Sequence, residues 1–169
     1  MELIVRRSGP HEAVLECDGG ALRAAIGLGG IGIKRAEGDG ITPVGVFPVR
    51  HVLYRADRIS PPPTGLMLKA IALDDGWCDA PEDPAYNRPV KRPYHASSEA
   101  LWRDDALYDL IVVLGYNDAP VVPGSGSAIF LHVARTDYGP TQGCIALARD
   151  DLLKAVSLLG PGDTIAIRA

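Results

Sequence analysis

Nineteen glycines and fourteen prolines are spread along the 169 residues of this chain. Both residues interrupt regular structure and favour turns, so the elements between them must be short. Several of these intervals are β-branched or alternate between apolar and polar residues, as strands do. The predicted strands cover residues 3–6, 13–17, 21–27, 45–54, 110–114, 128–134 and 164–167. The sequence therefore predicts a mainly β fold.

Only one or two helices are expected. The segment 150–159 starts with acidic residues, carries apolar residues at helical spacing and ends at Gly160-Pro161. A second, shorter helix is predicted from Ser97 or Ser98 to about Arg103. We expect one β-sandwich or barrel domain over residues 1–169, with the helices at its periphery. The 47% of hydrophobic residues suffices for one core.

The composition excludes several partners. A net charge of −4 gives no basic footprint for nucleic acid. No apolar run is long enough to span a membrane, and residues 1–7 are expected to form a first strand and not a secretory signal. Cys17 and Cys78 are expected to be free thiols, although pairing between them stays open. The chain is expected to be a monomer.

His132 and Cys144 are the residues that most strongly indicate chemistry. An apolar strand ends near His132, and a loop containing glycine and proline leads on to Gly143-Cys144. A thiol is a useful nucleophile when a base is near it and backbone N–H groups stabilise the oxyanion that forms. We therefore assign Cys144 as nucleophile, His132 as general base, and the N–H groups at Gly143 and Cys144 as oxyanion donors. The spacing matches no zinc motif, and neither a metal nor an organic cofactor is expected.

Two stretches of the chain resemble the L,D-transpeptidase catalytic domain family (YkuD-type). Thr141-Gln142-Gly143-Cys144 is similar to the family's Ser/Thr-His-Gly-Cys motif and follows a histidine, His132. The upstream segment 34–49, with Gly38-Asp39-Gly40-Ile41-Thr42-Pro43, resembles a second family segment. The chain departs from the family at Gln142, where histidine is usual, and at Ala146, where arginine is usual.

The resemblance implies the substrate and the reaction. The donor would be a peptidoglycan stem peptide and the acceptor an amine on another stem, joined through a thioester on Cys144 into 3→3 or 1→3 cross-links. The backbone carbonyl of Val133 would orient His132. Such a protein is expected in the periplasm or cell envelope of a bacterium. The alternatives are an L,D-carboxypeptidase or hydrolase on the same fold, and a non-catalytic peptidoglycan-binding module.

Substrate carboxylates and amides require cationic and amide partners. We expect Arg103 and Arg135 to bind carboxylates. The other predicted substrate-binding residues are His95, Tyr116, Asn117, Thr141 and Gln142. A catalytic Cys144 is also expected to be alkylated by iodoacetamide faster than Cys17 and Cys78.

Overall fold

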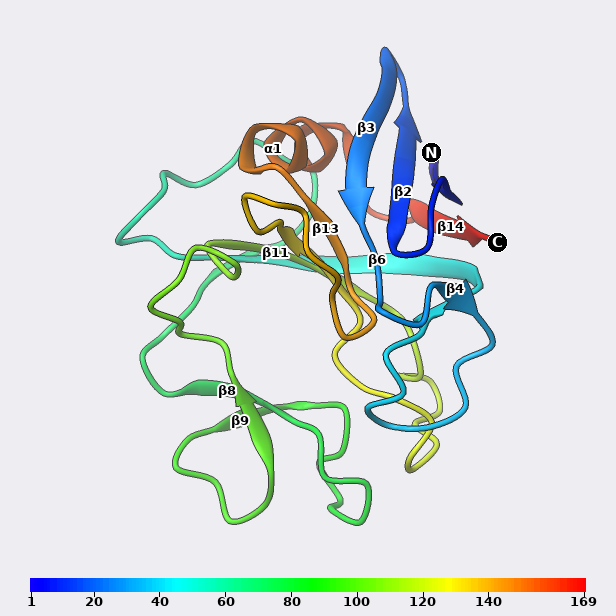
Figure 1. Ribbon diagram of the computed structural model, residues 1–169. Helices are drawn as coiled ribbons and strands as arrows, with labels where there is room; N and C mark the ends of the chain where they lie inside the picture. Colours follow the sequence, from blue (N-terminus) through cyan, green and yellow to red (C-terminus); the bar gives the residue numbers. More distant parts are fainter.

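A computed structural model describes all residues, 1–169. It contains one helix, α1 (Arg149–Leu158), and is otherwise built from strands (Figure 1). The long strands are β1 (Glu2–Arg7), β2 (Glu12–Cys17), β3 (Gly20–Ala25), β6 (Gly45–Tyr54), β11 (Leu110–Leu114), β12 (Phe130–Val133) and β14 (Thr164–Arg168). The shorter ones are β4 (Ile31–Gly32), β5 (Thr42–Pro43), β7 (Leu68–Ala70), β8 (Asp75–Cys78), β9 (Pro89–Lys91), β10 (Ser98–Ala100) and β13 (Ile145–Leu147).

The main sheet closes on itself. Its nine strands follow the order β11-β12-β13-β3-β2-β1-β14-β6-β7, and β11 also pairs with β6. This extra pairing forms a barrel and leaves only β7 outside the ring. The predicted mainly β architecture is confirmed.

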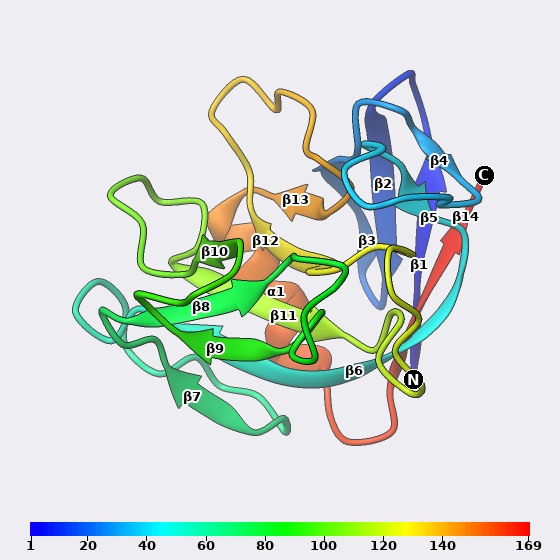
Figure 2. The same cartoon turned by 90° about the horizontal axis from the view of Figure 1, so that it is seen from below.

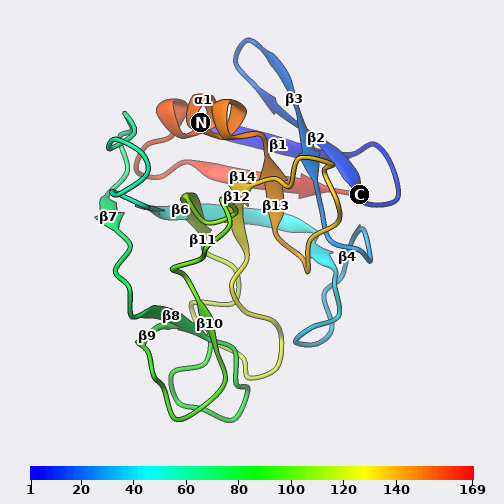
Figure 3. The same cartoon turned by 60° about the vertical axis from the view of Figure 1, so that its left-hand side comes forward.

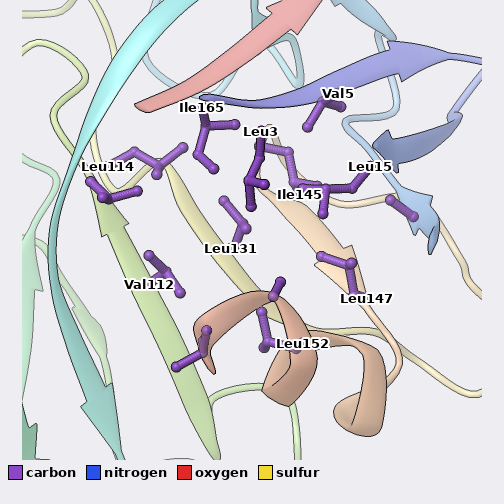
Figure 4. Packing of buried hydrophobic residues seen from close by; sticks show 14 of the residues in the cluster. Leu3, Val5, Leu15, Val112, Leu114, Leu131, Ile145, Leu147, Leu152 and Ile165 are labelled. Carbon is purple, nitrogen blue, oxygen red and sulfur yellow. The ribbon is translucent and has the colours of Figure 1, made fainter. Parts of the chain in front are cut away.

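The barrel interior holds the larger apolar core. Leu3, Leu15, Leu131 and Ile165 come from four different strands and point toward one another (Figure 4). Leu152 of α1 joins this cluster and is fully buried. The helix therefore packs its apolar face on the core, as its sequence pattern predicts.

A second, smaller sheet lies beside the barrel in the order β10-β8-β9 (Figure 2). Between the two sheets lies a separate apolar cluster that includes Trp77, Ile111 and Phe130. Because side chains alternate along a strand, β11 sends Leu110 and Val112 into the barrel core and Ile111 into the second cluster. The central strands are thus buried on both faces.

The expected helix from Ser97 or Ser98 to Arg103 is wrong. Residues Ser98–Ala100 form β10, antiparallel to β8, with Glu99 opposite Trp77. Pairing with β8 satisfies the backbone here and overrides a weak local helix signal.

Candidate active site

The two predicted catalytic residues lie on neighbouring strands. Strands β12 and β13 are parallel, with Leu131 opposite Ile145 and His132 opposite Ala146. A parallel pair requires a connection that returns across the sheet, and residues 134–144 supply it. Cys144, just before β13, therefore comes level with Phe130, two residues from His132. Figure 3 shows this connection between β12 and β13.

A cavity of about 470 Å³ opens over these strand ends. Its wall includes six of the residues predicted from sequence, namely Arg103, His132, Arg135, Thr141, Gln142 and Cys144. The remaining wall comes from the β12–β13 connection, from the segments before β5, β11 and β12, from the end of β8 and from β10. Residues far apart in the sequence thus share one concave site, as a ligand site requires.

The imidazole of His132 has a defined tautomer. Its Nδ1 lies 2.9 Å from the carbonyl oxygen of Val133. Because a carbonyl only accepts, Nδ1 carries the proton and Nε2 keeps a free lone pair. The ring also packs against the edge of Tyr108, with the centroids 5.4 Å apart. Burial lowers the pKa of His132 to about 4, so the ring is neutral at pH 7.

The thiol of Cys144 is neutral as well. It donates a hydrogen bond to the carbonyl of Ala128 at 3.1 Å and accepts one from the N–H of Phe130 at 3.4 Å. Burial raises the pKa of Cys144 to about 12. No hydrogen bond joins Sγ to the His132 ring in this resting state. The pair is therefore a thiol beside a neutral base, not a preformed thiolate–imidazolium pair.

One of the two expected oxyanion donors is occupied. The N–H of Gly143 donates to Thr141 Oγ1 at 3.1 Å, and that hydroxyl donates to the carbonyl of Cys144 at 2.7 Å. A threonine hydroxyl commonly closes such a turn on the backbone two residues ahead. The N–H of Cys144 makes no hydrogen bond. In the free protein the Cys144 amide is thus unbonded, while the Gly143 amide holds the turn.

The upstream segment 39–42 supports the nucleophile turn. The carbonyl oxygen of Ile41 lies so close to Gly143 that a Cβ on Gly143 would come within 2.9 Å of it. Gly143 also has a φ of +132°, a backbone conformation that residues other than glycine rarely adopt. Asp39 organises this segment by accepting from Lys34 Nζ at 2.6 Å and from backbone N–H groups, including that of Ile41. The two separated sequence motifs therefore form one structural unit.

The two arginines predicted to bind carboxylates differ. Arg103 lines the cavity, but its guanidinium already forms a two-point contact with Asp105 at 2.8 and 2.7 Å. Its guanidinium is therefore paired within the chain. Arg135 is exposed, lines the cavity and has no salt-bridge partner. It is the guanidinium that remains available for a substrate carboxylate.

Three predicted substrate-binding residues lie outside this cavity. His95 is on the surface and pairs with Asp83 at 2.7 Å. Tyr116 donates to the carbonyl of Ser125, and the side chain of Asn117 bonds to the backbone of residues 122 and 126. These side chains fold the loop before β12, and the structure gives them no place on the cavity wall.

Sequence reasoning did not single out several residues around the thiol. The amide of Asn87 accepts from Trp77 Nε1 and from the N–H of Ala128, both at 3.0 Å, and so fixes the carbonyl that receives the Cys144 thiol. Glu99 accepts from the hydroxyl of Tyr108. Asn87 lies in the connection from β8 to β9 and Glu99 lies in β10, so the pairing of β8 with both neighbours brings them to the site, and no local pattern signals it.

No group of three or more His, Cys, Asp or Glu side chains is arranged to hold a metal ion. No helix has the length and apolar character needed to cross a membrane.

Two solved structures are similar to the chain. L,D-transpeptidase 1 of Mycobacterium tuberculosis shares 14% identity over 98% of this chain and 61% of its own, with a TM-score of 0.41. An L,D-transpeptidase of Mycobacterium smegmatis shares 17% identity over 99% of this chain and 58% of its own, with a TM-score of 0.42. The chain thus spans less than two thirds of either structure. Among curated proteins, none matches it.

The family model described as the L,D-transpeptidase catalytic domain, YkuD, matches residues 2–167. This match spans the barrel, the nucleophile turn and the supporting upstream segment. The chain belongs to the L,D-transpeptidase catalytic domain family.

Proposed function

We propose that this chain is a cysteine-dependent peptidoglycan L,D-transpeptidase with Cys144 as nucleophile and His132 as base. The observation that carries the proposal is one cavity holding both the Cys144 thiol and an imidazole whose tautomer leaves Nε2 free to take a proton. We also propose that residues 1–169 act as a single domain. The reaction takes place in the cell envelope and uses no metal or organic cofactor.

The first half-reaction forms the acyl-enzyme. The thiol turns from Ala128 toward the donor carbonyl, its proton passes to His132 Nε2, and sulfur bonds to the carbonyl carbon. The N–H of Cys144 stabilises the oxyanion. When the C–N bond breaks, the leaving amine takes the proton from His132, which leaves a thioester and a neutral imidazole.

The second half-reaction transfers the acyl group. A neutral acceptor amine attacks the thioester carbon, and His132 takes the surplus proton from its nitrogen. Collapse breaks the C–S bond, and the proton returns to sulfur as the thiol. Arg135 lies at the cavity wall, where it can hold a substrate carboxylate during both steps. The product is a 3→3 or 1→3 cross-link.

Intact-mass spectrometry with purified disaccharide-tetrapeptide tests this proposal. The wild-type protein is expected to gain the mass of the acyl group and to release cross-linked dimers, and Cys144→Ala to do neither. Cys17→Ala is the matched control, because Cys17 lies outside the cavity. Shortened stems without dimers would instead identify a hydrolase. No adduct and no product would indicate a binding module.

A further inference from the structure

The catalytic cavity contains a carboxyl group that the proposed mechanism does not use. Glu99, in β10, is partly buried in the cavity wall and accepts a hydrogen bond from the hydroxyl of Tyr108. This is the only hydrogen bond of its side chain. Burial raises the pKa of Glu99, because its charged form is poorly solvated there. The contact with Tyr108 therefore offsets part of the cost of keeping a carboxyl group in this wall.

Tyr108 in turn contacts the catalytic base. Its ring packs on the imidazole of His132, with the ring centroids 5.4 Å apart and the planes at 76°. Tyr108 is only 6% exposed, so its ring has little room to move away. The backbone beside it is joined to the same place, since the carbonyl of Leu107 accepts from the N–H of Val133 at 3.0 Å. Val133 also supplies the carbonyl that faces His132 Nδ1.

The Tyr108 ring also packs on the residue that bonds the nucleophile. The rings of Tyr108 and Phe130 are T-shaped, with centroids 6.1 Å apart, and the N–H of Phe130 donates to Cys144 Sγ at 3.4 Å. Tyr108 thus contacts both the base and the support of the thiol. The hydroxyl is the one polar group of its side chain, so the hydrogen bond to Glu99 holds the far end of the ring.

We propose that Glu99 and Tyr108 are positioning residues that act as one unit: Glu99 holds the Tyr108 hydroxyl, and the Tyr108 ring holds the His132 imidazole. This inference rests on the proposed function of His132 as base. The torsion that turns an imidazole about its Cβ–Cγ bond is soft, and only one ring nitrogen of His132 is hydrogen-bonded. Packing by Tyr108 restricts that rotation and keeps Nε2 available to the Cys144 thiol.

A double-mutant cycle on the acylation rate tests the unit. Tyr108→Phe keeps the ring but removes the hydroxyl, and Glu99→Ala removes its acceptor. Each is expected to lower kcat for acylation at least tenfold, since misplacement by about 1 Å can cost roughly 100-fold. KM should stay within about threefold of the wild type, because Glu99 already engages the Tyr108 hydroxyl. Residues that act as one unit are not additive, so the double variant should lose less than threefold more than either single variant. Losses that multiply in the double variant would overturn the pairing.

Two further variants separate this hydrogen bond from general effects. Glu99→Gln is the rescue, because an amide oxygen can still accept from Tyr108, and its rate should lie within about threefold of the wild type. Tyr94→Phe is the matched control, since Tyr94 donates to Asp83 at 2.9 Å outside the cavity and its loss should leave the rate unchanged. Thermal unfolding identifies any variant that fails to fold.

The imidazole provides a readout that needs no substrate. In protein with ¹⁵N-labelled histidine, the signals of His132 are those lost in His132→Gln. The wild type and Glu99→Gln are expected to show a neutral ring with a slowly exchanging proton on Nδ1. In Tyr108→Phe and Glu99→Ala this proton should exchange with water at least tenfold faster. Equal exchange in all variants would overturn the positioning role, whereas the expected pattern in a protein that forms no thioester would count against the proposed function alone.

Discussion

The resting state of His132 and Cys144 determines how the reaction should depend on pH. Burial moves both groups toward their neutral forms, to a pKa of about 4 for the imidazole and about 12 for the thiol. The reactive neutral pair is therefore the main species between those values. Cys144 must therefore pass its proton to His132 in the course of the acylation step.

We predict that kcat/KM for acylation is lost only as the pH falls through about 4, where His132 becomes protonated. From roughly pH 5 to 10 the rate should be flat, because neither group titrates in that range. Stopped-flow or quenched-flow acylation with a donor whose amines are acetylated measures this profile. An acid limb near 6.5, the ordinary pKa of histidine, would show that His132 is not buried as described.

The same burial revises the expectation for iodoacetamide. Cys144 and Cys78 are buried, whereas Cys17 is partly exposed. Since alkylation needs an accessible thiolate, we predict that Cys17 reacts first and that Cys144 reacts at least tenfold more slowly at pH 7. Peptide mapping after timed alkylation ranks the three sites. A fastest reaction at Cys144 would instead indicate an open, ionised thiol.

At the scale of elements, the connection from β12 to β13 and the segment 39–42 act together. Gly143 meets the carbonyl of Ile41, and Asp39 holds the segment that carries this carbonyl. Gly143→Ala tests the nucleophile turn in this contact, and Asp39→Asn tests the segment 39–42.

Gly143→Ala is predicted to displace the nucleophile turn. The new Cβ would lie 2.9 Å from the carbonyl of Ile41 at a φ of +132°. Misplacement by about 1 Å can cost roughly 100-fold in rate, so acylation should fall by at least tenfold. Gly124→Ala is the matched control, because Gly124 also has positive φ but nothing lies within 4 Å of its Cβ position. An equal loss in both variants would attribute the effect to backbone strain alone.

Asp39→Asn is predicted to destabilise the fold at neutral pH. Although burial raises the pKa of Asp39, hydrogen bonds from Lys34 and from backbone N–H groups lower it from 3.8 to about 2. A depressed carboxyl pKa stabilises the folded state above pH 3.8, and this contribution is lost as the pH falls through about 2. Urea unfolding should show a loss of about 2 kcal/mol at pH 7 that shrinks by pH 2.5, where wild-type Asp39 begins to protonate. Asp18→Asn, at an exposed site, should change little at either pH.

The long strands were predictable because each carries its own apolar pattern. The predicted ranges 45–54 and 110–114 coincide with β6 and β11, and the helix differs by one residue at each end. The short strands β7 to β10 could not be found, since three or four residues carry no periodicity. Their pairing is set by distant partners, as with Glu99 opposite Trp77. Because the sequence did not predict this pairing, it also did not predict that Asp79, Asn87 and Glu99 lie at the site.

At the scale of the whole molecule, the closed barrel forms one core, and the Cys144 thiol packs in the other apolar cluster. Leu152 of α1 is fully buried in that core, while the thiol belongs to the second cluster. The side chains that stabilise the barrel are therefore largely different from those that form the site.

Leu152→Ala is predicted to lower the free energy of unfolding by about 2–5 kcal/mol, because it removes a packed side chain and leaves a cavity. Urea denaturation measures the loss. Lys154→Ala, on the exposed face of the same helix, should stay within about 0.5 kcal/mol of the wild type. A loss at Leu152 below 1 kcal/mol would mean that the helix is not packed on the core as Figure 4 shows.

The place of Cys144 in the second apolar cluster has a chemical consequence. Thiolates attack peroxides and disulfides, and a buried thiol with a pKa of about 12 forms almost no thiolate at neutral pH. The packing that keeps the Cys144 thiol un-ionised therefore also protects it from oxidation to sulfenic acid and from mixed-disulfide formation. We therefore expect Cys144 to react with a molecule that fills the cavity and breaks the hydrogen bond from its thiol to the carbonyl of Ala128.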